Sequence, residues 1–271
     1  MILSTRLSVK ILDLFFDEPL PAGVQADIVR YVQVSRPVPG MKNASIWTML
    51  LDTTQQPSEM LSKMKNHTRY KLRRAEKDEF EYEHFNGTDG DSIIRFGDHY
   101  DRYASMKGLS TLSRRRYRIL ADHGALDLSF MLDRRGEILV ASSCLLTESR
   151  VRGLHLAAAF RGTSDPSRRS LIGRANRYLR WRDILRFRQA GIRTFDFGGW
   201  YRGQGDAVRT NAFKAEFCGD IVEEFMCVQA LTLKGRIASL LFDGYSRLIM
   251  FRGKPESYAP ESEDRESSVP A

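Results

Sequence analysis

The residues best suited to chemistry lie in the segment Thr194–Gly219, TFDFGGWYRGQGDAVRTNAFKAEFCG. Its two adjacent glycines, Gly198 and Gly199, allow backbone conformations and close approaches that a Cβ would forbid. Lys214 is the only lysine of the segment, and a positioned ammonium can stabilise an oxyanion or hold a phosphate. Asp196 can accept a proton or orient a partner. Plain structural roles stay open: an exposed helix lysine and an aspartate bonded to backbone N–H groups.

Local signals predict the elements that hold these side chains. Residues Thr194–Phe197 read as a short strand, and the glycines and a polar turn over 200–205 end it. Asp206 is a capping residue for a helix to Phe217, and Gly219 can end that helix. A long helix from about Ser170 to Ala190 leads into the strand.

Three motifs in order carry a family resemblance. DFGG followed by FKAEFCG resembles the Fem-type peptidoglycan-bridge aminoacyltransferases and their single-domain relatives in the GNAT superfamily. The stretch 67–85, HTRYKLRRAEKDEFEYEHF, is similar to the family's RYxIRxAEKxG helix and strand, and 175–199 is similar to its long helix and last central strand. The resemblance covers roughly 47–219. It implies an α/β fold with a GNAT-type mixed central sheet flanked by helices.

The resemblance also suggests where an amine acceptor binds. On a helix predicted from Pro57 to Lys77, Arg69 and Arg73 are four residues apart and share a face. We expect both to point into the cleft of the double glycine and to hold a phosphate-bearing acceptor, although such a stripe is often only a solvated face. The other residues assigned to this pocket are Gly198, Gly199, Trp200 and Tyr178, whereas Trp181 and His155 read as core.

An acyl donor is expected at the loop Arg161–Arg169, because a strand–loop–helix junction directs backbone N–H groups and a positive helix end at an anion. GNAT acetyltransferases hold the pyrophosphate of coenzyme A at such a loop. This chain has Arg161 and Gly162 but lacks the full Q/RxxGxG/A spacing. Acyl-CoA is the favoured donor and aminoacyl-tRNA the alternative. The residues assigned to the donor are Arg161, Gly162, Arg168 and Arg169, and a surface loop with arginines is the plain alternative.

Composition limits the class of protein. The 271 residues carry a net charge of +8, with 42% hydrophobic and 28% charged residues, as in a globular protein with an anionic partner or a solvated basic face. Three cysteines without CxxC spacing indicate neither a disulfide framework nor a metal site. We read neither a signal peptide nor a membrane span, so the expected location is cytoplasmic.

The chain divides into three expected parts. Residues 1–45 are a poorly determined N-terminal segment with one strand near 30–38, 46–253 form the acyltransferase domain, and 254–271 are a disordered tail. Further strands are expected at 45–51, 80–85, 126–133, 137–147, 150–160 and 221–231, and further helices at 91–107, 113–123 and 233–251. The last helix has an apolar stripe that favours packing on its own domain or on a second copy, with membrane-surface contact as the alternative.

These observations predict an N-acyltransferase that moves an acyl group from acyl-CoA to an amino group of a phosphate- or nucleotide-bearing cell-envelope precursor, of amino-sugar type. The alternative within the class is a Fem-like aminoacyltransferase that uses aminoacyl-tRNA. The alternative from another class is a non-catalytic basic module on a GNAT scaffold that binds RNA or a membrane surface.

Overall fold

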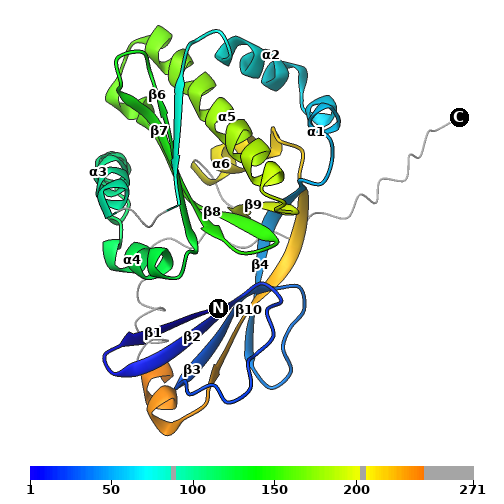
Figure 1. Cartoon of the computed structure of the whole chain (residues 1–271), viewed down its shortest axis with the longest axis vertical. Helices are drawn as coiled ribbons and strands as arrows, with labels where there is room; N and C mark the ends of the chain where they lie inside the picture. Colours follow the sequence, from blue (N-terminus) through cyan, green and yellow to red (C-terminus); the bar gives the residue numbers. More distant parts are fainter. Residues whose placement is uncertain (87–89, 202–205, 241–271) are drawn as a thin grey trace, which may run out of the picture.

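The strands form one mixed sheet in the computed structural model, which describes residues 1–86, 90–201 and 206–240 (Figure 1). Ten strands of the described residues lie in the order β1-β2-β3-β10-β4-β9-β8-β7-β6-β5. Only the pairs β2–β3 and β8–β9 are parallel. The strands are β1 (Ile2–Arg6), β2 (Val9–Phe15), β3 (Ile28–Val34), β4 (Lys42–Asp52), β5 (Glu81–Phe85), β6 (Leu126–Leu132), β7 (Ile138–Leu146), β8 (Arg150–Ala158), β9 (Thr194–Gly199) and β10 (Asp220–Ala230).

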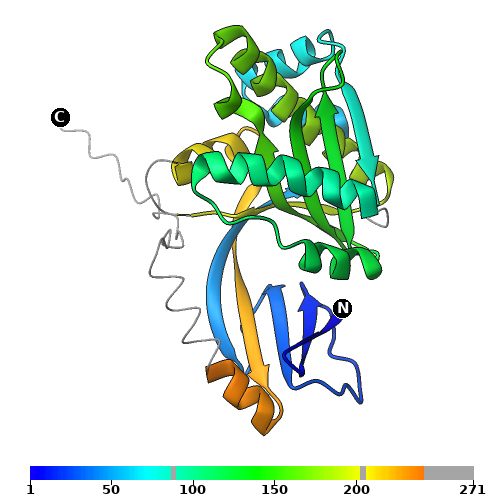
Figure 2. The same ribbon diagram turned by 90° about the vertical axis from the view of Figure 1, so that its left-hand side faces the viewer.

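Two long strands join the two halves of the sheet. β4 and β10 have 11 residues each and pair along nearly their whole length, from Asp220 opposite Leu50 to Val228 opposite Lys42. Figure 2 shows them running from the helical half into the half that holds β1, β2 and β3. The first 45 residues are therefore part of this sheet, and the boundary drawn between 45 and 46 falls inside β4.

Helices cover both faces of the half that contains β5 to β9 (Figure 1). Long α5 packs on one face together with α2, while α3 and α4 pack on the other. The helices are α1 (Pro57–Lys63), α2 (Asn66–Ala75), α3 (Gly90–Lys107), α4 (Arg114–Asp122), the 3₁₀ turn η1 (Ala159–Gly162), α5 (Pro166–Gln189) and α6 (Asp206–Ala215). Within the described residues, none of the helices has the length and apolar character needed to cross a bilayer.

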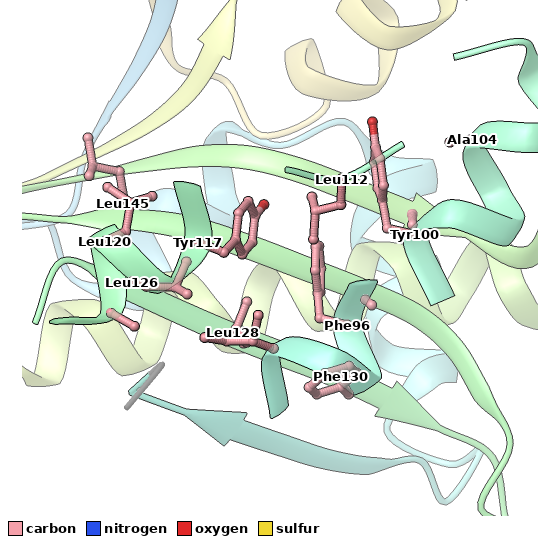
Figure 3. Close-up of a cluster of buried hydrophobic side chains, with 14 of the residues drawn as sticks. Phe96, Tyr100, Ala104, Leu112, Tyr117, Leu120, Leu126, Leu128, Phe130 and Leu145 are labelled. Carbon is pink, nitrogen blue, oxygen red and sulfur yellow. The ribbon is translucent and has the colours of Figure 1, made fainter. Parts of the chain in front are cut away.

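The core follows from strand periodicity, as β6 illustrates. All seven of its residues are buried, because helices cover both of its faces. Alternate side chains from Leu126 to Leu132 join the aromatic cluster beneath α3 and α4, which includes Phe96 and Tyr117 (Figure 3). Between them, Asp127 and Ser129 point to α5, where they bond to Arg186 and Asp183.

Most of the predicted strands and helices are confirmed, and two helices differ from the prediction. The helix expected over 57–77 is broken, because Met64 and Lys65 are extended and separate α1 from α2. The long helix begins at Pro166 rather than near residue 170, because Asp165 caps it by accepting from the N–H groups of Ser167 and Arg168. Residues 233–240 are helical as expected. The rest of that helix and the tail expected over 254–271 lie outside the described residues.

A buried ionic network connects the two halves of the sheet at the residues where β8 pairs with β9. Arg150 of β8 donates to Asp196 of β9 at 2.6 Å and to Glu224 of β10 at 2.6 and 2.8 Å. Gln33 of β3 donates to both carboxylates, at 2.9 and 3.0 Å. Gln33 is fully buried with φ 61°, a conformation that costs free energy in a non-glycine residue. The hydrogen bonds that this backbone permits offset that cost.

We predict that Arg150→Met lowers the free energy of unfolding by about 3–5 kcal/mol, because it leaves two buried carboxylates without their cation. Urea unfolding of the variant and of the wild type measures the difference. Arg193→Met, which changes an exposed arginine, is the matched control and should stay within about 0.5 kcal/mol. A loss below about 1 kcal/mol in Arg150→Met would show that the network does not hold the halves together.

Candidate active site

A cleft opens where β8 and β9 part. The two parallel strands pair only from Arg150 opposite Thr194 to Arg152 opposite Asp196, yet β8 continues to Ala158 and β9 to Gly199. Their outer edges stay bonded to β7 and β4, so the edges that face each other beyond residue 152 have no strand partner among the described residues. The cleft has a volume of about 570 Å³, and α5, α6 and α3 supply the rest of its wall.

The cleft is strongly cationic. Seven lysine and arginine residues line it, and no aspartate or glutamate is among its described lining residues. The seven are Lys107, Arg152, Arg169, Arg177, Arg180, Arg209 and Lys214. Arg177 is paired with Glu216 at 2.5 Å, but that carboxylate lies outside the lining. A cleft of this charge attracts anions and disfavours ammonium groups.

Lys214 extends from α6 to the double glycine. Its Nζ donates to the carbonyl of Gly198 at 3.1 Å and to that of Gly199, and the side chain is only 8% exposed. The pKa of Lys214 is lowered from the ordinary 10.5 to about 8. Burial is the main cause, Asp196 opposes the shift, and Arg152 and Arg180 add to it. Lys214 therefore carries a charge that is easily lost and lies close to two further cations.

Asp196 lies behind the cleft rather than in its lining. Its carboxylate accepts from Thr48 Oγ1, Gln33 Nε2, Arg150 Nη2 and the backbone N–H of Gly198. Burial works to raise its pKa, but Arg152, Arg150 and these hydrogen bonds outweigh burial and lower it. A carboxylate with four donors stays charged and holds its neighbours in place, so its position fits the orienting role better than the proton-accepting one.

Some of the acceptor residues predicted from the sequence lie at the cleft, and others do not. Gly198, Gly199 and Lys214 line it together. Trp200 and Tyr178 instead pack against the core beside it. Arg69 is not in the lining, because its guanidinium bonds back to the carbonyls that end α1, among them those of Ser62 and Met64 at 2.9 and 2.8 Å. Arg73 is exposed on α2 and is also absent from the lining.

The expected donor loop is largely occupied by the protein itself. Asp165 already bonds the free N–H groups at the start of α5. Arg168 is paired with Asp133 at 2.6 Å and with Glu137 at 2.5 Å, whereas Arg169 does line the cleft. Gly162 lies in η1 with the backbone of Arg161, whose side chain lies outside the described part of the structure. The helix start therefore offers Arg169 rather than open backbone N–H groups.

Sequence reasoning missed the cleft residues on β8 and on the buried face of α5. Arg152, Asn176 and Arg180 line the cleft, but α5 carries arginines around its whole circumference, so periodicity does not reveal which of them face inward. His155 lines the cleft as well, but Tyr117 Oη lies 2.7 Å from its Nδ1. Burial and then Arg116 lower the pKa of His155 to about 4. The histidine is thus neutral at pH 7 and bonded in the core, as the sequence suggested.

A mixed sheet with helices on both faces, parted between two parallel strands, is a fold that the chain shares with solved structures, and it confirms the mixed central sheet flanked by helices that was expected from the sequence. The chain is similar to FemX, with a TM-score of 0.54 and 15% identity over 66% of this chain and 61% of FemX. It is also similar to the C-terminal domain of a candidate lysylphosphatidylglycerol synthetase from Agrobacterium fabrum, with a TM-score of 0.52 and 14% identity over 81% of this chain and 72% of that domain. No family model and no curated protein matches the sequence.

We predict that wild-type stability, relative to that of Lys214→Met, rises between pH 8 and pH 10.5. In this window the unfolded lysine still binds a proton that the folded one has lost, so unfolding becomes less favourable as pH rises. The full interval between about 8 and 10.5 corresponds to about 3 kcal/mol of unfolding free energy. Urea unfolding of both proteins at pH 7.5 and pH 10 measures the part of it below pH 10, roughly 2 kcal/mol. An equal difference at the two pH values would mean that the ammonium is not perturbed.

Proposed function

We propose that the chain is an N-acyltransferase whose active site is the cleft between β8 and β9. It moves an acyl group from acyl-CoA to an amino group of an anionic acceptor, a phosphate- or nucleotide-bearing cell-envelope precursor of amino-sugar type. The observation that carries the proposal is the parting of the two strands beside Lys214. It leaves open backbone edges, a buried ammonium and a cationic wall within one cleft.

The open edges suit an extended donor. A chain with amide groups, such as the pantetheine arm of coenzyme A, can bond to an unpaired strand edge as an added strand does. Arg169 lies eleven residues before Arg180 on α5, or roughly 16 Å at the helical rise. A donor along this wall would place its phosphates near Arg169 and its carbonyl near Lys214. We call the region near Arg169 the outer end of the cleft and the region near Lys214 the inner end.

The charge of the cleft favours acyl-CoA over aminoacyl-tRNA. An aminoacyl group carries an ammonium beside its carbonyl, and the described lining residues include no carboxylate to receive it. The same cations would lower the pKa of an acceptor amine that enters the cleft, so that it loses its proton before attack. The acceptor would then need no general base from the protein. Asp196, whose four donors hold its carboxylate behind the cleft, acts by positioning Gly198.

In the reaction the neutral amine attacks the thioester carbonyl and a tetrahedral oxyanion forms. Lys214 Nζ, held by the carbonyls of Gly198 and Gly199, would stabilise this charge more than it stabilises the uncharged carbonyl. The nitrogen of this intermediate then gives up a proton to solvent, the C–S bond breaks, and coenzyme A leaves as a thiolate that solvent protonates. The similarity to a candidate synthetase of lysylphosphatidylglycerol fits an acceptor that carries phosphate.

The proposal is tested by incubating the full chain with acetyl-CoA and a panel of UDP-amino sugars, while thiol release and mass spectrometry follow the products. We expect thiol release that depends on the amine, with an acylated acceptor as the product. Aminoacyl transfer from charged tRNA under the same conditions would reassign the donor. Salt-dependent RNA binding without any transfer would replace the enzyme by the non-catalytic binding module.

We predict that Lys214→Met lowers kcat by about 10²–10³-fold, or roughly 3–4 kcal/mol, with little change in the KM for the donor, because the lost contact acts in the transition state. Steady-state kinetics measures it. Lys107→Met, which changes a cleft-lining lysine on α3, is the matched control and should keep kcat within a few fold. Unchanged kcat with a raised KM for the acceptor would make Lys214 a binding residue only.

A further inference from the structure

Arg180 is a buried cation with incomplete pairing. Its side chain is only 4% exposed, and its guanidinium lies 5.0 Å from the ring centre of Phe195 and 6.0 Å from that of Phe197. Its ion-pair partner, Asp183, is 3.8 Å away, which is beyond hydrogen-bond distance. The Asp183 carboxylate accepts from Tyr82 and Ser129 instead. Nε and Nη1 of Arg180 consequently have no hydrogen-bond partner among the described residues.

Other unsatisfied polar atoms border the same cleft. Seven buried side-chain atoms lack a partner in the described part of the chain, and four of them belong to Arg152, Asn176 and Arg180, which all line the cleft. Buried donors and acceptors are normally bonded, because an unmade bond costs free energy. A concentration of them in one place indicates a ligand that bonds to them.

The type of unsatisfied atom defines that ligand. Arg152 and Arg180 are donors only, and both lower the pKa of Lys214, so three cations surround the inner end. Asp196 and Glu224 offset these charges only in part, because both carboxylates are also bound by Arg150. Guanidinium groups bind carboxylates and phosphates through paired hydrogen bonds. Asn176 adds an acceptor, which suits an N–H or O–H next to the anion.

We propose that the inner end of the cleft binds an oxyanion group of the amine acceptor, a carboxylate or a phosphate, through Arg180 and Arg152. The assignment to the acceptor rests on the proposed function, whereas the anion site does not. A donor that lies along α5 places its own phosphates at Arg169, so the second anion belongs to the acceptor. The acceptor amine would then lie beside its own anionic group, next to Gly198 and Lys214. This narrows the substrate class to amines with a nearby carboxylate or phosphate.

Anion binding to the full chain tests the site without any reaction. Melting temperatures are measured in malonate and in inorganic phosphate, against chloride at equal ionic strength. At ten times the dissociation constant, either probe should raise the melting temperature of the wild type by about 3–6 °C. The stronger of the two probes identifies the oxyanion as carboxylate or phosphate.

Three variants locate the bound probe. Arg180→Met should weaken probe binding at least tenfold, and Arg180→Lys, which keeps the charge but loses the fork, should fall in between. Arg182→Met is the matched control, because Arg182 is an exposed arginine of the same helix outside the lining. Wild-type binding in Arg180→Met, or an equal loss in Arg182→Met, overturns the inner site. If Arg180→Met does not fold, Arg152→Met takes its place with the same expectation.

Kinetics then tests the assignment to the acceptor. Arg180→Met should raise the KM for the acceptor at least tenfold while the KM for acyl-CoA stays near wild type, and a rise in the donor KM alone overturns the assignment. If Arg180→Met loses probe binding and the wild-type protein shows no transfer with any donor, the anion site is kept and the proposed function is discarded. Acyl transfer with equal kinetics in wild type and Arg180→Met discards the site and keeps the function.

Discussion

The buried pairing of Arg150 with Asp196 and Glu224 is the interaction on which the rest of the structure depends. It lies where β8 and β9 last pair, and it connects β8, β9 and β10 through charges that are costly to bury unless they are fully bonded. Gln33 adds β3 to the same cluster and also accepts from Arg152. The N-terminal strands thus support one wall of the cleft, and the sheet acts as one unit.

The same arrangement explains why the cleft is cationic. The carboxylates near it, Asp196, Glu224 and Asp183, are all buried, and they are bonded to donors behind the strands or, for Asp183, on β5 and β6. Arg152, Arg180 and Lys214 face the opening instead. Separating the charges in this way leaves a preorganised positive field, which needs no rearrangement when an anion enters or a negative charge develops.

Aromatic packing fixes the residues that carry this field. The rings of Phe195 and Phe197 lie 4.9 Å apart, and that of Phe217 lies 5.4 Å from Phe197. These contacts join β9 to the chain just after α6 and so hold α6, with Lys214, against the double glycine. Gly198 has φ 76°, and a Cβ there would lie 3.0 Å from the carbonyl oxygen of Gly153. Glycine is therefore needed at the point where the strands part.

The sequence by itself determined the local features. The strand expected at 126–133, the helix expected at 113–123, and the strand, double glycine and helix around Lys214 depend on neighbours within a few residues, and all are present in the structure. Tertiary structure decided which arginines matter. Arg69 and Arg180 are alike in sequence, but Arg69 caps the end of the preceding helix, α1, and Arg180 is buried at the cleft. Pairing between β3 and β10 joins residues near 30 to residues near 228. No local pattern encodes such a contact, because burial and partner depend on segments that are remote in the chain.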